Sequence, residues 1–117
     1  MKKWIVLKKR REFVKVAEQG KRFVTPTVVL QFLDQPDENL PKDVIHVGFT
    51  TTKKIGIAVR RNRVRRRLRE AARQILPEFG KEGACYVLIG RSGTFDASFQ
   101  TILTDLKKAV QTIERVK

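Results

Sequence analysis

Arginine dominates the one stretch of this sequence whose residue types and spacing predict a specific chemistry. Between Lys53 and Arg73 the chain carries ten basic residues and a single acid, Glu70. The arginine guanidinium is a planar fork of N–H donors that matches the oxygens of a phosphate group two at a time. The chemistry that this stretch predicts is therefore the binding of a polyanion through its phosphates.

The same stretch also has the periodicity of a helix that packs on a core. Its apolar residues are Val59, Val64, Leu68, Ala71, Ala72 and Ile75. At about 100° per residue, Val64, Leu68 and Ile75 lie within roughly 40° of one another. A helix is therefore expected from about Ala58 to Leu76, with Pro77 ending it.

Helical geometry sorts the charges of this helix onto two flanks. The first flank is an i, i+4 ladder of Arg61, Arg65, Arg69 and Arg73, with Asn62 beside it, and the second flank holds Arg60, Arg63 and Arg67. Arginines at i and i+4 repel each other in an isolated helix. So many arginines with so few acids indicate that an anion normally lies among them, rather than that the helix merely has a solvated face.

The composition of the whole chain leads to the same class of partner. Its 117 residues fit one domain over residues 1–117, and a hydrophobic fraction of 41% is enough for a core. The 26 Lys and Arg outweigh the 12 Asp and Glu and give a net charge of +14. A dense polyanion such as nucleic acid is the partner that would offset this self-repulsion.

Cysteine usage and hydropathy set expectations for the compartment. Cys85 is the only cysteine, so a reducing cytoplasm is the natural location. No apolar run approaches the roughly 18 residues of a membrane span, and Trp4–Leu7 is much shorter than the core of a signal peptide. We expect a soluble, cytoplasmic protein with no membrane partner.

One helix and three strands are expected before the arginine-rich helix. In chain order they are a helix over residues 8–19, a short strand from Arg22 that Pro26 interrupts, a strand over Thr27–Leu33 and a strand over Val44–Thr50. Gly20 is expected to end the first helix in the left-handed conformation. Residues 34–43 hold two prolines and four acids, which is typical of an exposed connection.

One more strand and one more helix are expected after it. Ala84–Gly90 is nearly all apolar and predicts a strand buried on both faces. The last helix has Asp96 as its expected N-cap and an apolar face made of Phe99, Ile102, Leu103, Leu106, Val110 and Ile113. The order αβββαβα predicts an α+β, two-layer sandwich on a four-stranded sheet.

These residues resemble a known family. The segment KKIGIAVRRNRVRRRLREAAR, Lys53–Arg73, resembles the signature helix of the bacterial ribonuclease P protein subunit. The hallmark Arg-Asn-Arg of that family stands here as Arg61-Asn62-Arg63, and further basic positions follow it. The segment LKKRREFVKVAEQGKR, Leu7–Arg22, resembles the opening helix of the family, and the order of elements agrees over almost the whole chain.

The resemblance implies a ribonucleoprotein endonuclease whose RNA does the chemistry. In this family a catalytic RNA removes the 5′ leader of precursor tRNA, using Mg²⁺ that is bound mainly by RNA and substrate. The protein binds the catalytic RNA and the leader and raises the affinity for substrate and metal. The resemblance implies no catalytic or metal-binding side chain in the protein and no dinucleotide or other organic cofactor. It also implies a left-handed β-α-β crossover through the basic helix.

The resemblance further implies two RNA-binding surfaces. The residues expected to face the catalytic RNA are Lys53, Lys54, Arg60, Arg61, Asn62, Arg63, Arg65, Arg66, Arg69 and Arg73. The residues expected in a leader cleft between the first helix and the sheet are Lys9, Phe13, Ala17 and Gln31. The family often has aromatic residues where Ala17 and Gln31 stand. Contact with the leader would then rest more on Lys and Arg, or on Phe23 or Phe32 if either faces the cleft. Phe13 has packing in the core as its alternative role.

Two other classes of function stay open on the residues alone. A structural RNA-binding protein of ribosomal type shares the charge but needs no leader cleft. A nuclease with its own active site needs clustered carboxylates or a histidine pair. The acids of this chain fall mainly in residues 34–43 or are scattered on helices, and His46 is the only histidine, which disfavours the nuclease.

Overall fold

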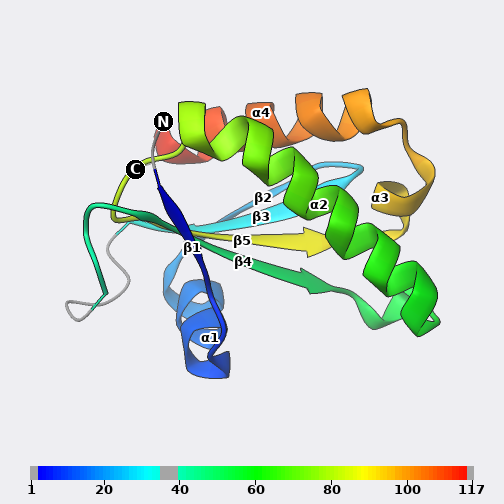
Figure 1. The fold of residues 1–117 in the computed structure, drawn as a ribbon, viewed down its shortest axis with the longest axis horizontal. Coiled ribbons are helices and arrows are strands. Elements are labelled where there is room, and N and C mark those ends of the chain that lie inside the picture. The colour runs from blue at the N-terminus through cyan, green and yellow to red at the C-terminus, as the bar shows by residue number, and fades with distance from the viewer. Residues whose placement is uncertain (1–2, 35–39, 116–117) are drawn as a thin grey trace.

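The computed structural model describes residues 3–34 and 40–115 and shows a mixed five-stranded sheet with helices on both faces (Figure 1). The elements in chain order are β1 (Trp4–Val6), α1 (Arg10–Gln19), β2 (Lys21–Val24), β3 (Val28–Leu33), β4 (Ile45–Thr51), the 3₁₀ turn η1 (Lys53–Ile55), α2 (Ala58–Phe79), β5 (Cys85–Gly90), α3 (Ser92–Asp96) and α4 (Phe99–Arg115). The expected α+β class is confirmed. Of the expected acidic connection over 34–43, residues 35–39 lie outside the described residues.

The sheet has the strand order β1-β4-β5-β3-β2. β4 runs parallel to both β1 and β5, whereas β3 runs antiparallel to β5 and β2. In Figure 1, β1 and β4 lie toward the viewer, β4 and β5 both point to the right, and α2 returns above the sheet. The crossover β4-α2-β5 is therefore left-handed, as the family resemblance implies and against the usual right-handed rule.

Side chains of the sheet point alternately into two cores. Tyr86 and Leu88 of β5 pack with β3, α2 and α4 on one face. Cys85 and Val87 of the same strand pack against Val16 of α1 on the other face. β5 is thus buried on both faces, as its sequence predicts. Because α1 covers the face opposite to α2, the helices form two outer layers rather than the one expected.

The fifth strand, β1, corrects the expectation of a four-stranded sheet. The Ile45 N–H donates to the Lys3 carbonyl at 2.9 Å, and the Leu7 N–H donates to the Val47 carbonyl at 2.7 Å. A three-residue edge strand forms through pairing with a segment far along the chain. Its own residues therefore carry little local signal of it.

Two helix ends differ from expectation. Gly20 ends α1 with an extended backbone, at φ −87°, and not in the left-handed region. Glycine is required there for space, because a Cβ would lie 2.4 Å from the Phe32 carbonyl oxygen. Pro77 lies within α2, which continues to Phe79. Proline has no backbone N–H to donate, so one hydrogen bond of the helix is lost at Pro77. Only Glu78 and Phe79 follow it in α2, so the loss falls in the last turn.

The start of α4 also differs from expectation. Asp96 belongs to α3, a short helix that the sequence analysis missed, and so it does not cap α4. Ser98 has that role, because its Oγ accepts a hydrogen bond from the Thr101 N–H at 3.2 Å.

Candidate nucleic-acid interface

α2 exposes its arginines because its opposite side is buried in the core. Val64 and Leu68 are fully buried and Ile75 is 8% exposed, as the periodicity predicts. Val59, which the sequence analysis counts among the apolar residues of this helix, is five residues and so about 140° away from Val64, and it is 73% exposed. The polar residues of α2 must therefore face solvent or the elements on its two sides.

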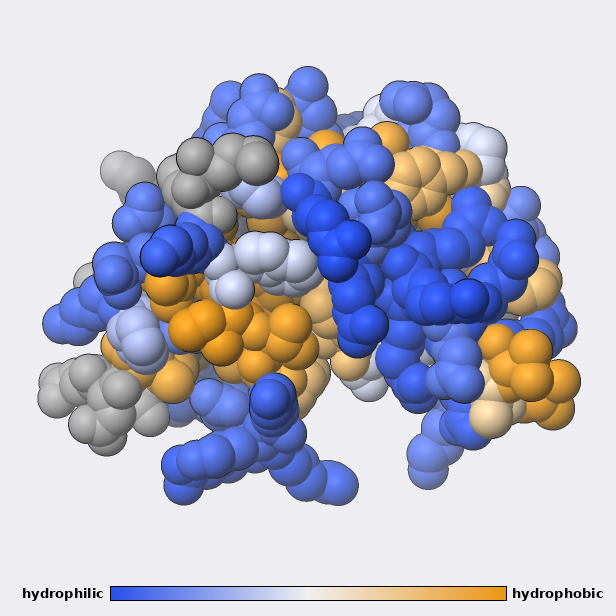
Figure 2. Space-filling view, in the orientation of Figure 1, coloured by the Kyte–Doolittle hydropathy of each residue, from blue (hydrophilic) through white to orange (hydrophobic). Residues whose placement is uncertain are grey.

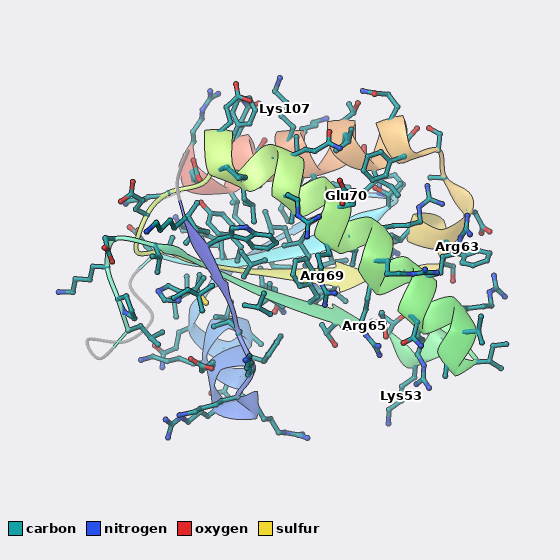
Figure 3. All side chains as sticks on the ribbon, in the orientation of Figure 1. Lys53, Arg63, Arg65, Arg69, Glu70 and Lys107 are labelled. Carbon is teal, nitrogen blue, oxygen red and sulfur yellow. The ribbon has the colours of Figure 1, made fainter. Side chains whose placement is uncertain are left out.

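Arg65 and Arg69 of the first flank point toward the side of the sheet where β1 lies (Figure 3). Arg65 Nη1 donates to Asn62 Oδ1 at 3.0 Å. Asn62 of the Arg-Asn-Arg motif therefore holds Arg65, which lies about one helical turn after it. The Arg69 guanidinium lies 5.6 Å from the centre of the Phe49 ring. Arg73 pairs with Glu70 at 3.2 Å, and both side chains are more than half exposed, so this pair stabilises little.

The second flank of α2 is held against α3. The guanidiniums of Arg60 and Arg63 lie 4.3 and 5.5 Å from the centre of the Phe95 ring. Arg67 donates to two backbone carbonyls, Phe95 O at 3.1 Å and Ala97 O at 2.6 Å. Arg67 therefore anchors the end of α3, and its neighbours keep their charge exposed on an aromatic support.

A groove lies between α2 and the first turn of α4, which we call the α2–α4 groove. Its volume is about 600 Å³, and it is lined by Arg63, Arg66, Arg67, Glu70 and Phe99. In Figure 3, Arg63 and Glu70 extend from the side of α2 that faces α3 and α4, away from Arg65 and Arg69. Figure 2 shows hydrophilic residues gathered along α2 on the visible face.

A second groove lies on the other face of the sheet, under α1, and we call it the α1 groove. Its volume is about 560 Å³, and it is lined by Lys8, Arg10, Phe13, Val14, Ala17, Gln31, Phe49, Thr50, Val87 and Ile89. Three residues expected in a leader cleft thus come together, namely Phe13, Ala17 and Gln31. Lys9 is not among the lining residues. It immediately precedes α1, and its neighbours Lys8 and Arg10 line the groove instead.

Phe13 both packs and lines the α1 groove. Its ring lies over Gly48 of β4, where a Cβ would lie 2.5 Å from Phe13 Cε1. The ring also contacts the small core of the α1 face. Phe23 and Phe32 do not face this groove, because both pack in the core on the α2 side.

A third groove continues from the α1 groove along the same face, and we call it the Lys53 groove. It has a volume of about 550 Å³ and is lined by Arg22, Val24, Pro26, Val29, Thr52, Lys53, Lys54, Ile89, Arg91, Ser92 and Gly93. Ile89 lines both grooves. Lys53 and Lys54, which were grouped with the arginines of α2, thus lie beside the path that leads to α1.

Sequence reasoning missed several lining residues of these grooves. Phe49 borders the α1 groove at the edge strand β4, although it pairs with Leu88 and its ring packs on the α2 side of the sheet. Arg22 and Arg91 are far apart in the sequence, and only the pairing of β2, β3 and β5 places them together. The alternation of β2 was the one available signal for Arg22, since it places Arg22 and Val24 on the same face.

The cations at these surfaces have few acidic partners. In the described ranges, the salt bridges are Arg73–Glu70 and Lys81–Asp34. The first-flank and second-flank arginines other than Arg73 therefore lack a carboxylate within 4 Å among those residues. Their uncompensated charge is what makes the surface a candidate for binding a polyanion.

The groups with altered pKa values lie in the core and not in the grooves. Burial, with a smaller contribution from Glu12, raises the pKa of the Cys85 thiol to about 12. Burial also raises the pKa of Tyr86, as does the hydrogen bond that its hydroxyl donates to Glu114. His46 is buried, and its Nε2 lies 2.8 Å from the Pro41 carbonyl oxygen. These groups pack the fold and offer no exposed nucleophile or base.

Neither a metal cage nor a membrane span was found in the part of the chain that the structure describes. Within residues 3–34 and 40–115, no three His, Cys, Asp or Glu side chains gather closely enough to hold a metal ion. No helix in those ranges is long and apolar enough to cross a bilayer.

Solved structures show that this architecture is the fold of bacterial ribonuclease P proteins. The RNase P protein of Staphylococcus aureus matches with a TM-score of 0.74 and 21% identity, and the match covers 95% of each chain. The RNase P protein from Thermotoga maritima matches with a TM-score of 0.75 and 24% identity, over 93% of this chain and 97% of that one. At these identities the likeness establishes the fold.

Sequence comparison establishes the family. The Ribonuclease P family model matches residues 1–114. The ribonuclease P protein component of Gluconacetobacter diazotrophicus is 47% identical over 105 residues, which cover 90% of this chain and 87% of that protein. The corresponding protein of Paramagnetospirillum magneticum is 40% identical over 107 residues, covering 92% and 80%. The chain belongs to the ribonuclease P protein family, which supports a role in the ribonuclease P ribonucleoprotein and in tRNA processing.

Proposed function

We propose that the chain is the RNA-binding subunit of ribonuclease P in the cytoplasm and that it contacts two RNAs through opposite faces of its sheet. On one face, α2 binds the catalytic RNA. On the other face, the α1 groove and the Lys53 groove bind the 5′ leader of precursor tRNA. The observation that carries this proposal is the presence of cationic grooves on the face that does not carry α2.

The face that carries α2 suits a folded RNA. Arg65 and Arg69 are held by Asn62 and Phe49, and Arg60 is held by Phe95. Guanidiniums fixed in this way meet phosphates at preset positions and lose less side-chain entropy on binding. Each phosphate contact also releases condensed counterions, which supplies affinity and makes it dependent on salt.

The α1 groove suits a single strand. Val87 and Ile89 form an apolar floor, the Phe13 ring stands at one side, and Lys8 and Arg10 supply charge. Unstacked bases bind such apolar and aromatic surface, while the phosphates bind the cations. A duplex would keep its bases stacked inside and would not use the floor. Arg22, Lys53 and Arg91 extend the cationic path past Ile89 for further nucleotides.

Phe49 borders the α1 groove but does not replace the aromatic residues that are missing at positions 17 and 31. Its ring lies on the α2 side of the sheet, near Arg69, and packs edge-on against Trp4 at 6.1 Å between ring centres. Gln31 offers amide donors and an acceptor to base edges in place of a ring. Stacking in the α1 groove is therefore assigned to Phe13.

The residues of the α1 groove and the Lys53 groove do not fit a Mg²⁺ cage. Mg²⁺ prefers oxygen ligands, above all carboxylates, phosphates and water. None of the lining residues of either groove is an Asp or a Glu. The proposal therefore leaves the catalytic Mg²⁺ to the RNA and the substrate. The protein's contribution is to hold the leader beside the RNA and to offset phosphate repulsion.

Cleavage of precursor tRNA tests this function against its two rivals. The assay compares the protein alone, a bacterial ribonuclease P RNA alone and the two together, at limiting Mg²⁺. We expect no cleavage by the protein alone and a higher kcat/KM for the mixture than for the RNA alone. Cleavage by the protein alone would establish a nuclease with its own site. An RNA whose activity the protein does not change would favour a structural protein of ribosomal type.

A further inference from the structure

The α2–α4 groove has features that the proposed function leaves unused. Arg63, Arg66, Arg67 and Glu70 follow the spacing i, i+3, i+4, i+7 and so form a stripe along one side of α2. Phe99, the first residue of α4, closes the groove from the other side. Its volume of about 600 Å³ lies within the usual range of small-ligand clefts, about 300–1,000 Å³.

Arg63 and Arg67 of this groove are held in place, and none of its three arginines forms a salt bridge within the described residues. The Arg67 guanidinium is held by the Phe95 and Ala97 carbonyls, and Arg63 is held near the Phe95 ring. Neither Arg63 nor Arg66 makes a salt bridge within the described residues. The N-terminal end of the 17-residue helix α4 adds partial positive charge beside them. This combination favours an anionic group such as a phosphate.

A phosphate alone does not account for the other two lining residues. Phe99 is partly buried and presents an aromatic ring to the groove. Glu70 is held by Arg73 at 3.2 Å, and its carboxylate repels phosphate but accepts hydrogen bonds from the amino groups of bases. A nucleotide matches both sets of residues. Its phosphate would lie toward Arg63 and Arg66, and its base would lie toward Phe99 and Glu70.

We propose that the α2–α4 groove binds one unpaired nucleotide of the catalytic RNA. The proposal rests on the proposed function, in which α2 contacts that RNA. The nucleotide must be unpaired, because a paired base stays inside its helix and cannot reach Phe99. The leader is not the occupant, because the α1 groove lies on the opposite face of the sheet (Figure 1).

Two variants of the full chain test the groove, with the catalytic RNA as the probe. Phe99→Leu keeps an apolar side chain and removes the ring, and Arg66→Gln removes an exposed charge without a packing role. Lys108→Gln is the control, because Lys108 is an exposed cation of α4 outside the groove. Affinity is measured with the catalytic RNA alone, and hydroxyl-radical footprinting locates the protected nucleotides.

We expect each groove variant to bind the catalytic RNA about tenfold more weakly. Both should lose protection of the same unpaired nucleotide, whereas Lys108→Gln should keep the parental footprint. If Phe99→Leu melts early, Arg66→Gln decides the matter, because its side chain is exposed. Parental affinity and footprint in Arg66→Gln would overturn the groove proposal and leave the proposed function standing.

Two other results would overturn it in different ways. A loss of binding that appears only with precursor tRNA would show that the groove binds the leader and not the catalytic RNA. Failure of the parental chain to bind the catalytic RNA at all would remove the proposed function, and the groove proposal with it.

Discussion

The two faces of the sheet carry positive charge in different ways. On the α2 face, neighbouring side chains hold the guanidiniums, as Asn62 holds Arg65 and Phe95 holds Arg60. In the α1 groove, Lys8 and Arg10 make no side-chain hydrogen bond with the described residues, and the floor beneath them is apolar. The α2 face is prearranged and polar, whereas the α1 groove is adaptable and partly apolar.

This difference matches the two kinds of RNA that the proposal assigns to the faces. A folded RNA presents its phosphates at set positions, so arginines held in advance reduce the entropy lost on binding. A single strand has no set shape, and stacking on an apolar floor tolerates any base. The comparison predicts that variants on the two faces have separable effects.

The largest effect is expected from Phe13→Ala on the α1 face. Removing the ring vacates the space over Gly48 and should lower the free energy of unfolding by about 3–5 kcal/mol. Phe13→Leu fills most of that space without a ring. It should weaken the binding of precursor tRNA by about 1 kcal/mol and leave mature tRNA unaffected, because only the precursor has a leader.

Melting temperatures and both tRNA affinities separate packing from stacking. A Phe13→Leu protein that melts normally and binds precursor tRNA like the parent would remove Phe13 from the leader site. Gln19→Ala is the control, because Gln19 is an exposed residue of α1 that does not line the α1 groove.

The next effect is expected from the double variant Arg65→Ala, Arg69→Ala on the α2 face. It should weaken binding to the catalytic RNA about tenfold or more and lower the slope of log K against log salt by about 1.5–2, since two phosphate contacts are lost. The loss should be equal for precursor and mature tRNA complexes. Titrations of the catalytic RNA at several salt concentrations measure the affinity and the slope. If both are unchanged, α2 does not contact the catalytic RNA.

A smaller effect is expected from anions on the free protein. Sulfate should raise the melting temperature by a few degrees more than chloride at equal ionic strength, because an anion that binds only the native state stabilises it by mass action. The gain should shrink in the Arg65→Ala, Arg69→Ala protein. Equal melting temperatures in the two salts would argue against discrete anion sites on α2.

The smallest effect is expected from Cys85 at alkaline pH. Burial raises the pKa of its thiol from 9.0 to about 12, so the native state keeps a proton that the unfolded chain loses. The stability that Cys85 contributes is therefore fully present below pH 9.0 and is lost as pH rises toward 12. Urea unfolding at about pH 8 and pH 10.5 should show a smaller alkaline loss for Cys85→Ala than for the parent. An identical loss in both proteins would contradict the assignment.

Much of the fold could be predicted because its main elements have local patterns. The apolar spacing of α2 and α4 and the apolar run of β5 place those elements to within a few residues. β1 and α3 could not be predicted in this way. β1 exists through its pairing with β4, and the Arg67 side chain anchors α3 from another helix.

The residues of the candidate site also fall into those that a local pattern predicts and those that depend on distant contacts. The arginines of α2 could be sorted onto two flanks from helical geometry, and the contacts with Phe49 and Phe95 agree with that sorting. Arg22 and Arg91 could not be assigned to one groove, because their meeting depends on which strands are neighbours. Local pattern indicates which residues are charged and exposed, and strand order decides which of them meet.

The pairing of β1 with β4 has a consequence for synthesis of the chain. Trp4 pairs with Ile45, so the first strand to leave the ribosome must wait until α1, β2 and β3 have emerged before its partner appears. The closing of such a long loop favours late formation of this edge. Hydrogen exchange during refolding should then protect the Leu7 amide, which bonds to Val47, after the amides of β5. β1 would thus leave the ribosome before the other strands of the sheet and be among the last to be secured.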